Sequence, residues 1–421
     1  MLIKTGGEAD PQNLAGLAGM TAELLTQGTA SRSAPEIAEA IEVLGGSIES
    51  GAGWDSSLAQ VEVMTEKADA AINILADVVR RPSFKDEEIE RLRQQTLDEL
   101  SVSLSQPGTL ARYAAARVLF GDTPYAHPLS GTPESLAQIK RPDIARLHNT
   151  YYRPDNAVLL IGGNIKADAA FGLAERYFGD WAKPASALLT RTAEAPAVAI
   201  KSVRVIVVDK PDAGQAAVLL VRPGLKRAES DYYTGLVTNS VLGGGYSARL
   251  NQEVRIKRGL SYGASSALDV RRETGPFTAA TQTKNQSAAE VASVLIGELR
   301  RLSSDAVPAE ELVPRKAALI GTTSLALETN KGLVTYLGSL ALHNLSLDEI
   351  NKYIDQIQAV NVEGIQRFAR SRLNADEAQI VIVGNAQEFL PDLRQKFTEV
   401  EVIPFTELDL NTASLRRARA K

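Results

Sequence analysis

The stretch VLGGGYSARLNQEVRIKRGLSYGASS (Val241–Ser266) decides the fold of this chain. Its glycines, Gly243–Gly245, follow an apolar helical run and precede no Lys-Ser/Thr pair, so they predict a tight turn with close backbone approach and not a phosphate cradle. An amphipathic helix then carries Arg255, and Tyr262 follows seven residues later at the start of a strand. Taken alone, such an arginine is typical of a surface charge and such a tyrosine of half-buried packing.

Length and composition indicate a globular protein with two domains. The 421 residues are too many for one ordinary core and suit two domains of roughly 200 residues each. Hydrophobic residues make up 44% and charged residues 23%, as in ordinary globular proteins. The formal net charge of −5 gives no global field that would attract nucleic acid or anionic lipid. No apolar run approaches the ~18 residues of a membrane span.

Periodicity and capping signals predict helices alternating with strands. The pair Asp10-Pro11 is typical of a helix start, and the apolar spacing after it predicts a helix that Gly28 ends. Ser33 with Glu36 predicts a capping box for the next helix. Two more helices are expected over residues 68–81 and 86–104, a strand over 58–65, and a turn followed by a buried strand over 151–164.

The second half of the chain repeats features of the first half in the same order. The run AVLLIGGN from Ala157 is echoed by AQIVIVGN from Ala378, and AAINILADVVRR from Ala70 is echoed by AEVASVLIGELRR from Ala289. Both offsets are about 220 residues, as a duplicated domain would give. A stretch rich in proline and small residues separates the copies. The predicted limits are therefore a first domain over 1–183, a linker over 184–201 and a second domain over 202–421.

These motifs, in this order, resemble the pitrilysin family of zinc metallopeptidases, in the branch with mitochondrial processing peptidases and small bacterial two-subunit enzymes. The stretch Val241–Ser266 carries the resemblance most specifically, and matching segments extend from about residue 5 to about residue 390. The resemblance implies an α+β fold of two tandem homologous domains, each a mostly antiparallel sheet packed with helices. The first strand of the family domain has no counterpart, so we expect the numbering to begin inside a longer product. The other matching segments are GLAGMTAELLTQGT (Gly16–Thr29), LGGSIESGAGWD (Leu44–Asp55), YAHPLSGTPESL (Tyr125–Leu136) and YYRPDNAVLLIGGN (Tyr151–Asn164).

The metal motif of the resembled family is degenerate in this chain. Family enzymes use H-x-x-E-H on a helix, where two histidines at i and i+4 bind zinc and the glutamate activates water. The flanking residues place Gly19 and Glu23 at the histidine positions and Ala22 at the base. Glu99 stands 76 residues after Glu23, where the family has its distal ligand. Two carboxylates without a nitrogen ligand or a base make a poor zinc site, so we expect ordinary polar roles for both.

The histidines do not suggest a metal site elsewhere. His127, His148 and His343 lie far apart in sequence, and no two of them have i, i+4 spacing. A structural role is expected for each. We therefore predict no catalytic metal in this chain.

The resemblance gives Arg255 and Tyr262 a catalytic role. In the family, an arginine and a tyrosine seven residues apart in the C-terminal half reach substrate bound on the zinc. The seven-residue spacing to Tyr262 selects Arg255 over Arg258, which lies one turn further on. A phenol can donate a hydrogen bond to the oxyanion that forms at the scissile carbonyl, and a guanidinium can hold a neighbouring carbonyl.

The expected function follows from this contrast between the two halves. We predict a non-zinc-binding subunit of a heterodimeric metallopeptidase, inactive alone, whose homologous H-x-x-E-H partner supplies zinc and base for the hydrolysis of peptides. The alternatives are a non-enzymatic core or substrate-recognition pseudopeptidase, and a homodimer that only binds peptides. The chain has no cysteine, which excludes disulfides and suits an oxidising compartment. A periplasmic location is therefore expected, and a cytoplasmic one stays open.

Overall fold

The computed structural model describes residues 1–189 and 202–417, which divide into two compact units. Unit 1 contains residues 1–100, 128–189 and 326–347, and unit 2 contains residues 101–127, 202–325 and 348–417. Each unit thus takes segments from both halves of the chain. The predicted limits, 1–183 and 202–421 around a linker over 184–201, follow chain order. Most of that linker lies outside the described residues, so these limits remain a prediction.

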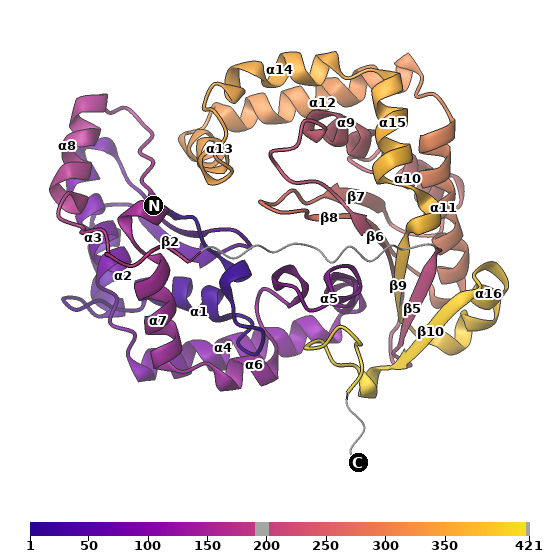
Figure 1. Cartoon of the computed structure of the whole chain (residues 1–421), viewed down its shortest axis with the longest axis horizontal. Helices are drawn as coiled ribbons and strands as arrows, with labels where there is room; N and C mark the ends of the chain where they lie inside the picture. The colour runs from indigo at the N-terminus through magenta and orange to yellow at the C-terminus, as the bar shows by residue number, and fades with distance from the viewer. Residues whose placement is uncertain (190–201, 418–421) are drawn as a thin grey trace. The chain divides into compact units, whose positions relative to one another are not determined.

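Unit 1 is built on a four-stranded sheet with the order β2-β3-β1-β4 (Figure 1). Every neighbouring pair is antiparallel. The strands are β1 (Leu2–Ile3), β2 (Ser47–Ala52), β3 (Ser57–Glu62) and β4 (Ala157–Val158). The helices of this unit are α1 (Leu17–Glu23), α2 (Ala34–Val43), α3 (Ala68–Arg80), most of α4 (Asp86–Ser105), α6 (Pro133–Gln138), α7 (Arg141–Tyr151), α8 (Ala167–Phe178) and α13 (Asn330–Leu342).

The helix that carries the degenerate metal motif starts later than predicted. Residues 11–16 form turns, and α1 begins at Leu17 because Gly16 takes the left-handed conformation with φ of +92°. The side chain of Asp10 contributes to this helix start: its carboxylate oxygens accept the N–H groups of Gly16 and Ala18, each at 2.8 Å. A short 3-10 turn continues α1 to Thr26. The N-cap residue is Gly16 and not the predicted Asp10, and the predicted first helical residue, Pro11, is also wrong; Asp10 contributes only through its side chain.

The other predicted elements of unit 1 agree with the structure except at residues 151–164. The carboxylate of Glu36 accepts the N–H of Ser33 at 2.7 Å at the start of α2. The helices expected over 68–81 and 86–104 are α3 and α4. The buried strand expected within 151–164 is instead the short, half-buried β4. It ends at Val158 because its ladder with β1 consists of two residue pairs.

Unit 2 is built on a six-stranded sheet with the order β10-β5-β9-β6-β8-β7. The pairs β10-β5 and β5-β9 are parallel, and the others are antiparallel. The strands are β5 (Arg204–Asp209), β6 (Ala216–Pro223), β7 (Ala264–Leu268), β8 (Pro276–Thr283), β9 (Gln379–Gly384) and β10 (Glu399–Pro404). The helices of this unit are α5 (Pro107–Phe120), α9 (Tyr232–Leu242), α10 (Arg249–Asn251), α11 (Ala288–Ser304), most of α12 (Ala309–Leu327), α14 (Glu349–Ala359), α15 (Val362–Arg372) and α16 (Leu390–Lys396).

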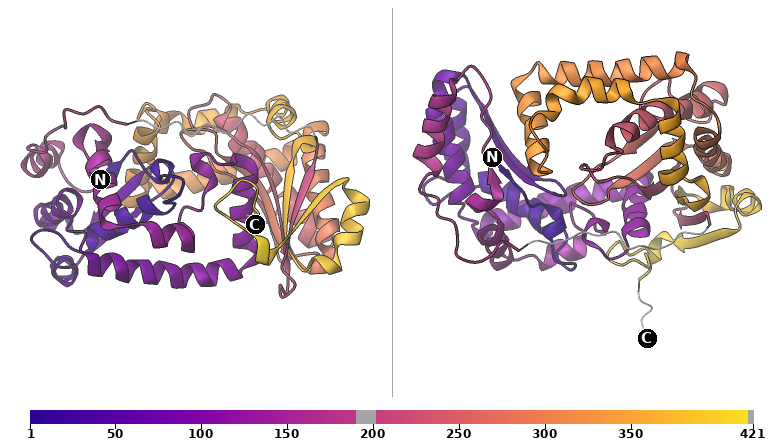
Figure 2. Two further views of the ribbon diagram at one scale, coloured as in Figure 1. Left: turned by 60° about the horizontal axis from the view of Figure 1, so that its bottom comes forward. Right: turned by 45° about the horizontal axis from the view of Figure 1, so that its top comes forward.

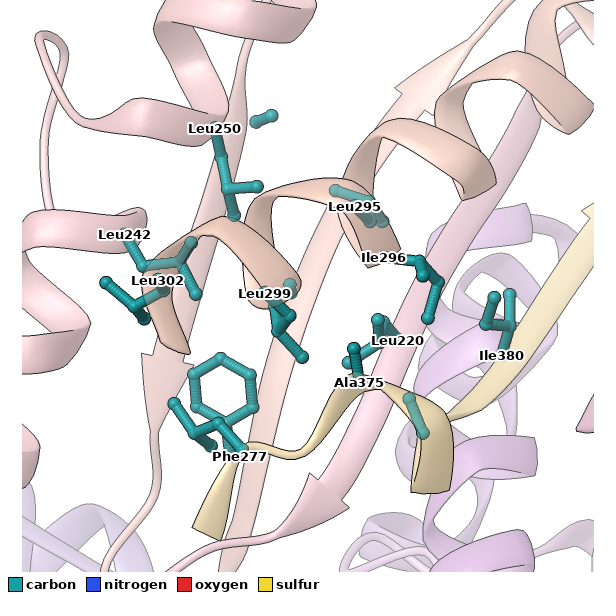
Figure 3. Close-up of a cluster of buried hydrophobic side chains, with 14 of the residues drawn as sticks. Leu220, Leu242, Leu250, Phe277, Leu295, Ile296, Leu299, Leu302, Ala375 and Ile380 are labelled. Carbon is teal, nitrogen blue, oxygen red and sulfur yellow. The ribbon is translucent and has the colours of Figure 1, made fainter. Parts of the chain in front are cut away.

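Helices cover both faces of the larger sheet (Figures 1 and 2). Alternate residues of β6, such as Val218 and Leu220, belong to the main core with α11, and α5 packs on β6 and β9. Burial of both faces explains why these strands are continuous apolar runs in the sequence. Figure 3 shows core side chains of this cluster, with Leu299 of α11 between Leu250 and Phe277 in the view. Leu250 ties α10, the start of the segment that carries Arg255, to this core.

The two units repeat one topology. The order β2-β3-β1-β4 of unit 1 matches β7-β8-β6-β9 of unit 2, with antiparallel pairing throughout. The echoed helices α3 and α11 each follow a 3-10 turn. The units also hold one helix each from the opposite half of the chain, α13 in unit 1 and α5 in unit 2. The predicted α+β class with two mostly antiparallel, helix-packed sheets is confirmed.

Candidate functional site

The glycine turn ahead of Arg255 brings the end of α9 against β7. A Cβ on Gly243 would lie 2.2 Å from the backbone nitrogen of Ser266, so no larger residue fits there. The N–H of Ser266 donates to the carbonyl of Gly243 at 3.1 Å. The predicted tight turn with close backbone approach is therefore confirmed.

Arg255 lies on a π-helix and not on the regular amphipathic helix expected from the sequence. The π-helix covers Gln252–Lys257 and continues directly from α10. Leu250 and Val254 are fully buried and fix this segment to the core of unit 2. π-helical turns are rare and occur frequently at functional sites, because they re-aim side chains that an α-helix would place elsewhere.

The guanidinium of Arg255 faces an aromatic ring. Its Cζ lies 5.0 Å from the ring centroid of Tyr246, a cation–π distance. Within the described parts of the chain Arg255 forms no ion pair, whereas the neighbouring Arg249 binds Glu311 through two hydrogen bonds of 2.9 and 2.8 Å. The in-plane N–H groups of Arg255 are therefore available to a ligand.

Tyr262 presents its side chain to solvent from the loop between the π-helix and β7. The side chain is 89% exposed. The loop is nevertheless held in place: the hydroxyl of Thr283 donates to the carbonyl of Leu260, and that of Thr281 to the carbonyl of Gly263, each at 2.6 Å. Since β7 is an edge strand of the sheet, the phenol stands at the border of unit 2 on a fixed backbone.

A buried carboxylate neutralises the other cations around Arg255. Glu253 accepts hydrogen bonds from Lys257 and Arg258, and Arg301 lies 3.5 Å from it. Burial disfavours the charged form of Glu253, but the hydrogen bonds from Lys257 and Arg258 prevail and lower its pKa. Arg258 is thus a structural ion-pair partner, in agreement with the choice of Arg255 by spacing.

The degenerate metal motif lies on α1 and α4 of unit 1. Ala22 is fully buried, whereas Glu23 and Glu99 are exposed. Desolvation by the surrounding protein, followed by the negative charge of Glu99, raises the pKa of Glu23. Gly19 has room for a side chain, because a Cβ would meet the carbonyl oxygen of Leu129 at 3.7 Å. In the described ranges no three His, Cys, Asp or Glu side chains gather as a metal site would require.

The three histidines occupy separate places. His148 is buried in α7, where its Nε2 lies 2.9 Å from the carbonyl of Val79. Because a carbonyl can only accept, Nε2 carries the proton, and burial lowers the pKa of the ring. His127 is buried in unit 2, and His343 follows α13 in unit 1.

Two residues of the candidate site were missed by the sequence reasoning. Tyr246 is 64% exposed and supplies the ring for Arg255, and the buried Asn251 bonds both the Tyr246 backbone and the start of β7. An aromatic residue directly after a glycine turn was the only signal for Tyr246.

Unit 1 also holds a mainly apolar cavity of about 410 Å³ between β3, α3, residues 159–163 and α13. None of the predicted site residues lines this cavity.

The fold is a two-domain α+β arrangement, and comparison with known protein families gives its class. The insulinase model of peptidase family M16 matches residues 1–133, and the peptidase M16 inactive-domain model matches residues 138–319. The chain belongs to peptidase family M16, the pitrilysin family. No helix in the described residues is long and apolar enough to cross a membrane.

Relatives of similar length are described as zinc proteases, as a protease or as a peptidase M16 inactive domain. An uncharacterized zinc protease of Bacillus subtilis is 26% identical over 90% of this chain and 91% of its own length. One from Mycobacterium leprae is 29% identical over 88% of this chain and 83% of its own. A crystal structure of a peptidase M16 inactive domain from Pseudomonas fluorescens is 27% identical, with a TM-score of 0.83 and 91% coverage of both chains. A protease structure from Helicobacter pylori, 20% identical, shares the fold with a TM-score of 0.85 over 91% of this chain and 92% of that one.

Proposed function

We propose that this chain is the non-zinc-binding subunit of a heterodimeric zinc metallopeptidase that hydrolyses peptides. The observation that carries the proposal is the contrast between its two candidate sites. Arg255 and Tyr262 stand on a braced scaffold with their donors available, whereas Gly19, Ala22 and Glu23 provide neither nitrogen ligands nor an accessible base. A homologous partner with an intact H-x-x-E-H helix would supply the nitrogen ligands and the base that Gly19, Ala22 and Glu23 do not provide.

In the proposed complex the two residues act on the substrate peptide. The Tyr262 hydroxyl donates to the oxyanion that forms at the scissile carbonyl, and the Arg255 guanidinium donates to a neighbouring main-chain carbonyl. The two histidines of a partner's H-x-x-E-H helix would hold zinc, which would supply Lewis-acid polarisation of the carbonyl and a water of lowered pKa. Membership of a peptidase family and similarity to proteins described as zinc proteases support this reaction class. The similarity to a peptidase M16 inactive-domain structure supports a chain that does not itself bind zinc. We also propose a periplasmic location.

The alternative proposal is a non-enzymatic subunit that recognises peptides or forms the core of an assembly. The buried alanine at the base position favours it as much as it favours the heterodimer. The two proposals differ over Arg255 and Tyr262. Under the alternative these two side chains take no part in catalysis. Replacing them would then leave the peptide-cleavage rate of any complex that contains this chain unchanged.

The test is a substitution series in the complex formed with the H-x-x-E-H homologue from the same genome. Tyr262→Phe is expected to lower kcat by about 10²–10³-fold, the effect of losing one oxyanion-hole donor. Arg255→Ala is expected to lower kcat/KM, because the proposed contact of its guanidinium is with a neighbouring main-chain carbonyl and not with the oxyanion. Tyr177→Phe is the matched control, because its hydroxyl donates to the exposed Asp69 in unit 1. Subunit association is measured for each variant by native mass spectrometry. Unchanged peptidase rates with intact association would remove the catalytic role.

A further inference from the structure

The ring of Tyr246 is the side-chain group that the structure places on the guanidinium of Arg255. The separation of 5.0 Å between Cζ and the ring centroid is within cation–π range. Glu253, the buried carboxylate nearest in sequence, is taken by Lys257, Arg258 and Arg301. No ion pair to Arg255 forms anywhere in residues 1–189 and 202–417.

An aromatic partner differs from a carboxylate in which donor groups of the arginine stay free for a ligand. A carboxylate binds the in-plane N–H groups of an arginine, as Glu311 does with Arg249. A ring binds the face of the guanidinium and leaves those N–H groups directed outward. The contact with the Tyr246 ring can therefore orient Arg255, and within the described residues no side-chain acceptor occupies the donors that a peptide carbonyl would use.

Tyr246 is itself held by a buried side chain. The amide nitrogen of Asn251 donates to the Tyr246 carbonyl at 2.5 Å, and its oxygen accepts the N–H of Ala264 at 3.3 Å. Asn251 is 4% exposed, so this bridge is well shielded from water. The same residue thus fixes the backbone of Tyr246 and the strand start two residues after Tyr262. The ring that orients Arg255 and the loop that carries the phenol share one anchor.

We propose that Tyr246 is a positioning residue for the proposed reaction, which holds the Arg255 guanidinium through the face of its ring. The inference rests on the proposed function, since it acts through Arg255. The aromatic ring of Tyr246, and not its hydroxyl, orients the Arg255 guanidinium. Because Tyr246 is 64% exposed, the contribution of the cation–π contact is modest, about two- to five-fold in kcat/KM.

The test is a double-mutant cycle on kcat/KM in the assembled complex, with Tyr246→Leu, Arg255→Ala and the double variant. We expect Tyr246→Leu to lower kcat/KM about two- to five-fold. The same change should have no effect in the Arg255→Ala background, and Tyr246→Phe should retain full activity. Phe171→Leu is the control, because Phe171 is an aromatic residue of α8 with 74% exposure. Thermal unfolding of each variant checks that the fold is intact.

The outcomes separate the two levels of the proposal. An equal effect of Tyr246→Leu in both backgrounds would overturn the positioning role, and so would a loss of activity in Tyr246→Phe. Full activity of Tyr246→Leu beside an impaired Arg255→Ala would also overturn it, while the proposed function stands. Full activity of Arg255→Ala would instead overturn the proposed role of Arg255, and the positioning role with it.

Discussion

Glu23 on α1 and Glu99 on α4 are electrostatically coupled: partial desolvation of the Glu23 carboxyl and, after it, the negative charge of Glu99 raise its pKa. Both carboxylates stand at positions where family enzymes place metal ligands. This half of the chain has thus kept a carboxylate at the distal ligand position and lost both histidines and the catalytic base.

The first prediction concerns this electrostatic coupling. Glu99→Gln removes the charge and should lower the pKa of Glu23, while desolvation should keep it above the ordinary glutamate value. A carboxyl-carbon NMR titration measures the shift. Asp98→Asn, a neighbouring exposed position on α4, is the control and should change the Glu23 pKa less. An unchanged Glu23 pKa in Glu99→Gln would show that the two carboxylates do not interact.

The second prediction is that zinc binding can be restored. In Gly19→His/Glu23→His the two imidazoles stand at i and i+4 on α1, and Glu99 completes a two-histidine, one-carboxylate set. Gly19 has the space for a Cβ. We expect stoichiometric zinc by isothermal titration calorimetry in the double variant and none in the natural chain. Adding Glu99→Gln should weaken binding about 10-fold or more, and peptide hydrolysis should stay absent because Ala22 remains at the base position. Equal zinc binding with and without Glu99 would refute its place in the ligand set.

The third prediction concerns the anchor of the Arg255 segment. Asn251→Ala leaves the Tyr246 carbonyl and the Ala264 N–H without their buried partner, which should lower the free energy of unfolding by about 1–3 kcal/mol. Urea denaturation measures the change. Asn351→Ala, an exposed residue on α14 that donates to Asp348, should cost less than about 0.5 kcal/mol. Equal free energies of unfolding for the two variants would mean that the hydrogen bonds of Asn251 do not stabilise the fold.

The fourth prediction is a pH dependence from His148. Its folded-state pKa is lowered by burial, so the unfolded chain binds the proton first as the pH falls, and stability is lost from about pH 6.5 downward. His148→Gln removes this titration. Between pH 7 and pH 5.5 the natural chain should lose more stability than the variant in urea denaturation. Parallel pH profiles for the natural chain and His148→Gln would contradict a neutral buried ring.

The sequence predicted the elements whose signals are local. The capping pair Ser33 and Glu36 appears as expected, because caps depend on three or four consecutive residues. The glycine turn at Gly243 also appears, because a close backbone approach excludes every other residue. The first helix was misplaced because Gly16, and not Pro11, sets its start through a left-handed conformation.

What the sequence missed depends on contacts between distant segments. Hydrophobic periodicity in the sequence does not distinguish a π-helix from an α-helix, so the direction of the Arg255 side chain could not be predicted. The cation–π contact of Arg255 with Tyr246 depends on how the glycine turn and the π-helix fold back on each other. The strand at Ala157 was overestimated because its extent depends on the length of its partner β1. The exchange of α5 and α13 between the halves of the chain has no local signal at all.

The central claim is tested most directly by titrating this chain into a fixed amount of the H-x-x-E-H homologue and measuring the cleavage of an unstructured fluorogenic peptide. The account predicts no cleavage by this chain alone, activity that rises to a plateau at one-to-one stoichiometry, and loss of that activity with chelator or with Tyr262→Phe. Chelator-sensitive cleavage by this chain alone would contradict it, and so would a mixture whose rate is the same with Tyr262→Phe as with the natural chain.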